Sequence, residues 1–276
     1  MIALGRYNSL EIMRSTQVGL FLGDDDGAEV LLPNKYVPKG YEIGDSIEVF
    51  CYLDHQERPV ATTLRPKVTR DGFAYLKVAD ITDFGAFMEW GLEKHLLVPF
   101  REQSVKMKKG YQYLVHCYLD DETFRLVGST RIDRFLDNDN HDLSKGQRVA
   151  LVAHRKTDLG WEVIIENKFK GLVFFSDIFR EIKTGDKFDG FVKNVRPDHK
   201  IDVILHQEGV DVLEPSANSI YEKLKMSDGY LALHDKSSPE LIYEAFQMSK
   251  KTFKKAIGVL YKKEKIVIKD DGIYIK

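Results

Sequence analysis

The chain has 276 residues, of which 43% are hydrophobic and 30% charged, a composition that is ordinary for a globular protein and excludes a disordered one. The formal net charge of −2 gives no sign by itself of a strongly basic nucleic-acid binder. No apolar run approaches the roughly 18 residues that cross a membrane, and the first ten residues lack the basic and apolar regions of a signal peptide, so the sequence predicts a protein of the cytoplasm.

Three segments of the chain align without gaps around two glycine anchors. The first anchor is Gly19, Gly85 and Gly160, and the second is Gly44, Gly110 and Gly185. The two anchors lie 25 residues apart in every copy, and the copies are offset by 66 and then 75 residues. Because such agreement is hard to produce by chance, we interpret the segments as three copies of one domain. The anchor glycines are expected to serve a β-bulge or a tight bend.

Each copy has the pattern of five short strands separated by turn residues. In the first copy the expected strands are Leu4–Met13, Val18–Leu22, Val30–Pro33, Ser46–Leu53 and Pro59–Leu64. Five short strands with period-2 alternation in about 65 residues favour a small closed barrel over an open sheet. The predicted fold class is therefore mainly β, with tandem five-stranded OB-type β-barrels at residues 1–66, 67–136 and 145–208.

The two cysteines fall at the same position of two different copies. Cys51 and Cys117 begin the matching strand ends Cys51–Asp54 and Cys117–Asp120. They are therefore expected in separate cores, as buried free thiols rather than as a disulfide.

Residues 215–276 follow a different pattern, with helical spacing of apolar residues. The expected elements are a helix at Ser216–Lys225, a strand at Tyr230–Leu233, a helix at Leu241–Met248 capped by Ser238, a helix capped by Ser249, and a hairpin at Ile266–Ile275. The last helix has the apolar stripe Phe253, Ala256, Ile257 and Leu260. Since Asp271-Gly272 is a strong hairpin signal, this order predicts a winged-helix (α+β) domain.

An aromatic pair flanks the first anchor glycine of the second copy. OB barrels stack bases on rings of their central strands, and we expect Phe84 and Phe87 to contact RNA in this way, with packing inside the protein as the alternative. The corresponding residues are Val18 and Phe21 in the first copy, where Phe21 is a weaker candidate, and Leu159 and Glu162 in the third. Trp161, which aligns with Ala86, is expected in the core.

The segment Asp83–Met88, DFGAFM, resembles the S-one-type OB fold, an RNA-binding repeat. The hallmark of that family is D-F-G-A-F-V, then G-L-V-H-x-S, then G-D before a strand. Gly171-Leu172-Val173, Gly44-Asp45 and Gly185-Asp186 match the later motifs. The family histidine is replaced by Pro33, Pro99 and Phe174, so no copy keeps the full binding face and low sequence specificity is expected.

Basic residues supply further candidates for contact with RNA phosphates. Residues 146–208 carry a net charge of +1, whereas residues 1–70 and 71–145 carry −2 and −3. In this third copy the candidates are Arg155, Lys156, Lys168 and Lys170. An exposed, solvated loop is the alternative for each of them.

The C-terminal domain is more basic, with 12 Lys against 8 Asp and Glu in residues 215–276. Its last helix offers Lys250, Lys251, Lys254 and Lys255. Lysines bind phosphates but read bases poorly, and that helix has no Arg, Asn or Gln for bidentate base contacts. Backbone binding is therefore favoured over operator recognition, and a solvated helix face is the alternative.

The order of three such repeats and a winged helix resembles the conserved virulence factor B family of bacterial RNA-binding proteins. The resemblance implies a cytoplasmic regulator of gene expression that acts post-transcriptionally by binding single-stranded RNA. Two other functions stay open: a DNA-binding transcription regulator acting through the winged helix, and an adaptor that contacts the ribosome or another protein.

Catalytic residues, cofactors and metals are not expected. The acidic clusters Asp24-Asp25-Asp26 and Asp120-Asp121-Glu122 fall at turns, where acidic residues favour solvent. No histidine lies at zinc-binding spacing from a cysteine, and neither a phosphate-binding loop nor a nucleophile elbow is present. The sequence therefore predicts that the protein is not an enzyme.

Overall fold

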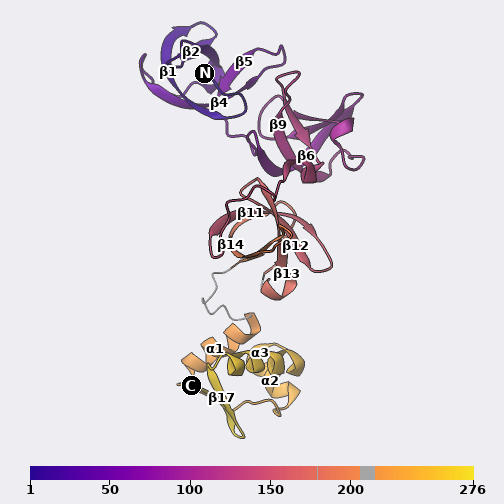
Figure 1. Cartoon of the computed structure of the whole chain (residues 1–276). Helices are drawn as coiled ribbons and strands as arrows, with labels where there is room; N and C mark the ends of the chain where they lie inside the picture. Colours follow the sequence, from indigo (N-terminus) through magenta and orange to yellow (C-terminus); the bar gives the residue numbers. More distant parts are fainter. Residues whose placement is uncertain (179, 206–214) are drawn as a thin grey trace. The chain divides into compact units, whose positions relative to one another are not determined.

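The computed structural model of the chain describes residues 1–178, 180–205 and 215–276 (Figure 1). The chain divides into two compact units, the first made of Met1–Ser176 and Ile182–Leu205, the second of Asp177–Glu181 and His206–Lys276. The first unit contains β-barrels and the second a small helical domain with a short sheet. Residues 206–208, which the sequence assigned to the third barrel, lie outside the described residues.

The described part of the first unit forms three closed five-stranded barrels, as predicted. Barrel 1 consists of β1 Tyr7–Thr16, β2 Gly19–Gly23, β3 Glu29–Pro33, β4 Ser46–Leu53 and β5 Pro59–Thr62. Barrel 2 consists of β6 Gly72–Thr82, β7 Gly85–Glu89, β8 Leu96–Pro99, β9 Gln112–Leu119 and β10 Leu126–Ser129. Barrel 3 consists of β11 Arg148–Lys156, β12 Gly160–Ile165, β13 Phe169–Phe174, β14 Lys187–Val195 and β15 Ile201–Ile204.

All three barrels share one topology. The first strand pairs with the second and the fourth, and the third and fifth strands pair in parallel to close the barrel. A 3-10 helix follows each third strand: η1 Asn34–Tyr36, η2 Phe100–Glu102 and η4 Phe175–Asp177. A fourth, η3 Ile132–Phe135, follows barrel 2.

The first strand of each barrel contains a β-bulge, which lies between Ile12 and Arg14 in β1, between Val78 and Asp80 in β6, and between Ala153 and Arg155 in β11. The second glycine anchor docks on this bulge. The N–H of Gly110 donates to the carbonyl of Val78 over 2.9 Å, and the same bond recurs at Gly44 and Gly185. Because β1 continues past its bulge, it ends at Thr16 rather than at the predicted Met13, and it begins at Tyr7 rather than at the predicted Leu4.

The first anchor position requires glycine because the neighbouring strand passes very close to it. A Cβ at Gly85 would lie 2.3 Å from the carbonyl oxygen of Val98 on the neighbouring strand, and similar clashes of 2.1 and 2.0 Å would arise at Gly19 and Gly160. The anchor glycine thus permits a close approach between the second and third strands. Of the two roles expected for this glycine, a bulge or a tight bend, the bulge is wrong, since it lies in the strand before. Gly85 instead directly follows the turn between β6 and β7.

Consecutive barrels of the first unit share buried apolar contacts. Phe50 of β4 belongs to the same buried cluster as the core of barrel 2, and its ring centroid lies 5.9 Å from that of Trp90. Phe73 of β6 likewise packs with Val152 and Ile164 of barrel 3.

The two cysteines, Cys51 and Cys117, are fully buried in separate clusters, as predicted.

Trp161 was expected in the core of barrel 3, but it is half-buried. Its counterpart Ala86 is fully buried, so the corresponding interior position of barrel 2 holds only a methyl group. An indole is too large for such a position in a closely packed barrel. The buried neighbour is instead Glu162.

The second unit has the predicted winged-helix order. Its elements are α1 Pro215–Met226, β16 Tyr230–Leu231, α2 Pro239–Phe246, α3 Lys250–Lys262, β17 Ile266–Lys269 and β18 Gly272–Ile275. The hydroxyls of Ser238 and Ser249 cap α2 and α3, as predicted. The predicted stripe of α3 is buried against α1 and the sheet. Among the helices of the described residues, none has the length and apolar character needed to cross a membrane.

Candidate nucleic-acid interface

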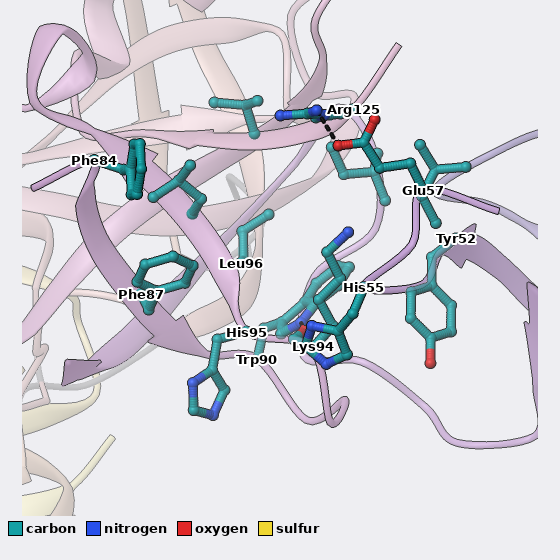
Figure 2. Close-up of a pocket in the computed structure, with 14 residues that line it drawn as sticks. Tyr52, His55, Glu57, Phe84, Phe87, Trp90, Lys94, His95, Leu96 and Arg125 are labelled. Atoms are coloured by element: carbon teal, nitrogen blue, oxygen red, sulfur yellow. Dashed lines mark hydrogen bonds and ion pairs between the residues drawn. The ribbon is translucent and has the colours of Figure 1, made fainter. Parts of the chain in front are cut away.

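The aromatic pair of barrel 2 lies at the edge of a pocket. Phe84, in the turn between β6 and β7, is 74% exposed, and Phe87 of β7 is half-buried opposite Leu97 of β8. Both rings line a pocket of about 330 Å³. Figure 2 shows the two rings on one side of this pocket and Tyr52 and Glu57 on the other. The structure therefore brings the two predicted stacking residues together on one accessible face.

The opposite wall of the pocket comes from barrel 1. It is formed by Tyr52 and Leu53 of β4 and by His55 and Glu57 of the turn that follows. Sequence reasoning missed this contribution, because nothing in the repeat pattern shows which copy packs against which face.

Another aromatic residue of barrel 2 was also missed. Phe100 is 49% exposed at the start of η2, directly after Pro99, which pairs with Gly85. It therefore lies beside the turn that carries Phe84. Its signal in the sequence is its place one residue after the position of the family histidine.

In barrel 1 the predicted residue Phe21 is half-buried, and one face of its ring is covered. The guanidinium carbon of Arg14 lies 4.1 Å from the ring centroid, and Arg14 is held by an ion pair with Glu29. This ion pair raises the pKa of Arg14 and lowers that of Glu29. A base could stack on this ring only after Arg14 moves.

In barrel 3 the corresponding face is neutralised by internal ion pairs. The buried carboxylate of Glu162 pairs with both Arg155 and Lys170. Asp133 of η3 also pairs with both, at 3.7 Å from Arg155 and 2.7 Å from Lys170, and the hydrogen bond from Lys170 lowers the pKa of Asp133. Two of the predicted basic contacts are therefore engaged within the protein.

The other two predicted basic residues of barrel 3 lie elsewhere. The Lys156 ammonium is 5.4 Å from the ring centroid of Phe175, another exposed aromatic residue. Lys168 is exposed and lines a different pocket, together with Asp137 and Asp142. The four basic residues thus do not converge on one groove.

The lysines of α3 lie on the side away from the buried stripe, as predicted. Lys251, Lys254 and Lys255 are exposed, and Lys254 lies 3.8 Å from Asp235. The ammonium of Lys250 donates to the carbonyl of Lys236 over 3.3 Å. The tip of the β17–β18 hairpin is acidic and carries Asp270 and Asp271, so the helix rather than the hairpin tip attracts phosphates.

The part of the chain that the structure describes contains no candidate metal-binding site. Within those residues, no three side chains of His, Cys, Asp or Glu come close enough together to hold a metal ion.

The fold and these faces define the class of protein: a chain of OB barrels and a winged helix, which are domains of nucleic-acid-binding type. Comparisons with known proteins agree with this class. Residues 4–64 match the S1 domain, and residues 218–275 match the CvfB-like winged helix domain.

Several relatives match this chain over most of its length. The chain is 26% identical to Conserved virulence factor B of Staphylococcus epidermidis, over 98% of this chain and 94% of that protein. It is 27% identical to Conserved virulence factor B of Staphylococcus aureus, over 84% and 80%. It is also 28% identical to Uncharacterized protein YitL of Bacillus subtilis, over 99% and 93%. The predicted resemblance to the conserved virulence factor B family is confirmed.

A solved structure also matches the whole chain. It is a multidomain protein with nucleic acid binding domains from Streptococcus pneumoniae, 25% identical over 99% of this chain and 98% of that one, with a TM-score of 0.41.

Proposed function

We propose that the chain binds single-stranded RNA with low sequence specificity and regulates gene expression post-transcriptionally in the bacterial cytoplasm, without enzymatic activity or a cofactor. The observation that carries this proposal is the exposure of Phe84 beside Phe87 on the strand face of barrel 2. A phenylalanine ring left in water forgoes about 1.5–3 kcal/mol of burial free energy, which a stacked base recovers in part. Such a position suits a ligand with a flat ring.

Low specificity follows from the chemistry of the groups available. Every base has a π-face that can stack on phenylalanine, and an ammonium group attracts any phosphate. The exposed face of α3 supplies Lys251, Lys254 and Lys255 for the second kind of contact. The two kinds of contact come from different units of the chain.

The second candidate is a duplex-DNA regulator, which the lysines of α3 favour. The hairpin tip opposes it, because Asp270 and Asp271 would repel the DNA backbone. Barrel 2 also opposes it, since bases in a duplex are stacked on one another and present no free face to Phe84.

A filter-binding series with the full chain tests the proposal. Single-stranded RNA and duplex DNA of equal length would be titrated at increasing salt. We expect tighter binding of the RNA, with log affinity falling linearly with log salt by about 0.7 per phosphate contact. Tighter binding of the duplex would favour the second candidate. Absence of RNA binding in dilute buffer would refute the proposal and point to a protein or ribosome adaptor.

A further inference from the structure

The pocket beside Phe84 and Phe87 is built by two barrels, and this goes beyond the usual strand face of an OB fold. Barrel 1 contributes the end of β4 and the turn after it, including Leu53 and His55. Glu57 of the same turn pairs with Arg125 of barrel 2 across the rim (Figure 2). A strand lying on barrel 2 therefore meets a wall that barrel 2 alone would not have.

This wall is held in place by buried contacts. The Trp90 indole N–H donates to the carbonyl of Lys94 over 2.6 Å, and the ammonium of Lys94 donates to the carbonyl of Asp54 over 2.7 Å. Trp90 is also packed edge-on against Phe50 of barrel 1. Because apolar burial and hydrogen bonds both link the barrels here, the pocket is formed before any ligand arrives.

The lining of the pocket suits a flat ring with a polar edge. Its floor is apolar, with Trp90, Leu96 and Leu126, and its polar groups are the imidazoles of His55 and His95 and the ammonium of Lys94. Burial lowers the pKa of Lys94. A volume of about 330 Å³ lies at the lower end of the range of small-ligand pockets, about 300–1,000 Å³.

The equivalent face of barrel 3 has a pocket of a different kind. Its pocket of about 540 Å³ is lined by Arg155, Glu162 and Lys170, whose charges pair with one another. Among the described residues, none from β9 of barrel 2 or from the turn after it lines this pocket, although the matching segment of barrel 1 lines the pocket of barrel 2. The junction of barrels 1 and 2 is thus a site of its own.

We propose that this junction pocket takes one nucleobase of the bound RNA, turned out of the stack that its neighbours form on Phe84 and Phe87. This inference rests on the proposed function. It adds that binding depends on the base of one particular nucleotide, the one that enters the pocket. Turning one base out costs little in a single strand, and the pocket offers the base an apolar lining and polar partners for its edge.

The test uses the full chain and six-nucleotide RNAs that each lack one base at a different position. Leu53→Trp fills the pocket from the barrel 1 side, away from the stacking rings. We expect it to weaken binding of the intact RNA about tenfold, and to abolish the effect of removing the base that occupies the pocket. Effects of removing the bases stacked on Phe84 and Phe87 should persist in this variant.

The matched control is Leu119→Trp, at the same strand end one repeat later and outside the pocket lining. It should leave the base-removal profile of the wild type unchanged. A second variant, Lys94→Met, keeps the aliphatic stem and should reduce the effect at the same RNA position severalfold. Thermal unfolding would confirm that each variant is folded.

Two results would overturn the inference while leaving the proposed function standing. In one, the wild type binds RNA and Leu53→Trp binds it equally well. In the other, Leu53→Trp and Leu119→Trp give the same base-removal profile. If the wild type binds no RNA at all, the proposed function itself fails, which is a different observation.

Discussion

Phe87 of barrel 2 and Glu162 of barrel 3 occupy the same position of their barrels. Each lies two residues after the first anchor glycine, and each pairs with a leucine on the next strand, Leu97 or Leu172. In barrel 2 this position presents a ring to a pocket, whereas in barrel 3 it buries a carboxylate between two cations. One fold thus gives an apolar face in one copy and a charge-compensated face in another.

The apolar face of barrel 2 leads to the first prediction. Stacking contributes about 1–3 kcal/mol per base, which is about 5- to 150-fold in affinity for each stacked base that is lost. Phe84→Ala/Phe87→Ala should therefore weaken RNA binding by at least about 5-fold, measured by fluorescence anisotropy. Leu159→Ala, at the position of Phe84 in barrel 3 and also exposed, is the control and should change little. An unaltered affinity in the double variant would remove barrel 2 from the interface.

The repeat pattern predicted the barrels because their geometry depends on local features that recur. The two anchors mark a close strand approach at Gly85 and a turn docked on a bulge at Gly110, and both features need glycine in every copy. Spacing in sequence therefore reports spacing in the barrel. The function of each glycine was not predictable, because the bulge itself carries no distinctive residue.

The ion pairs of barrel 3 were not predictable for a different reason. Asp133 belongs to the segment after barrel 2, and Lys170 to β13, so their contact depends on how η3 packs on barrel 3. A positive residue count indicated a basic groove, but the neutralising carboxylates come from β12 (Glu162) and from η3 (Asp133). The net charge of a sequence segment therefore does not determine the net charge of the barrel face that the segment forms.

The two glycine anchors should differ in their tolerance of substitution. Gly110→Ala requires a left-handed backbone, with φ near +83°, but leaves open space for the Cβ, so it should cost about 1–2 kcal/mol. Gly85→Ala adds a clash with the carbonyl of Val98 and should cost clearly more. Urea unfolding at constant pH would measure both, and equal losses would contradict the close approach of β7 and β8.

The buried imidazole of His116 should make the free energy of unfolding depend on pH. It is buried between the rings of Phe73 and Phe135, at centroid distances of 4.5 and 4.1 Å. Burial lowers its pKa from 6.5 to about 4. Above pH 6.5 the imidazole is neutral in both states and has no effect, whereas between pH 6.5 and 4 only the unfolded chain takes up the proton. Stability should therefore fall by about 3 kcal/mol over this interval.

Substitution separates this effect from that of other groups. His116→Phe should make the free energy of unfolding less dependent on pH between 6.5 and 4, as measured by urea titrations at several pH values. His154, whose pKa burial also lowers to about 4, would keep part of the dependence. The exposed His95→Phe is the control and should leave the profile unchanged. If His116→Phe has the same profile as the wild type, protonation of His116 is not linked to unfolding.

The divergence between Phe87 and Glu162 predicts a gain of binding. Glu162→Phe places a ring at the position of Phe87 and releases Arg155 and Lys170, which stay half-exposed beside Asp133 and so leave no buried charge unpaired. Replacing a buried ion-pair network by an apolar side chain is often neutral or stabilising, so the variant should fold. Its RNA affinity should rise about tenfold, from one new stacking position and two available cations.

The measurement is best made in the Phe84→Ala/Phe87→Ala background, where barrel 2 no longer supplies the stacking rings. Glu162→Gln removes the negative charge without adding a ring, and it should give the smaller part of the gain. A stable Glu162→Phe protein that binds RNA no more tightly than its parent would show that barrel 3 does not lie along the path of the strand. A gain from Glu162→Gln equal to that from Glu162→Phe would assign the effect to charge, because the added ring would then contribute no stacking.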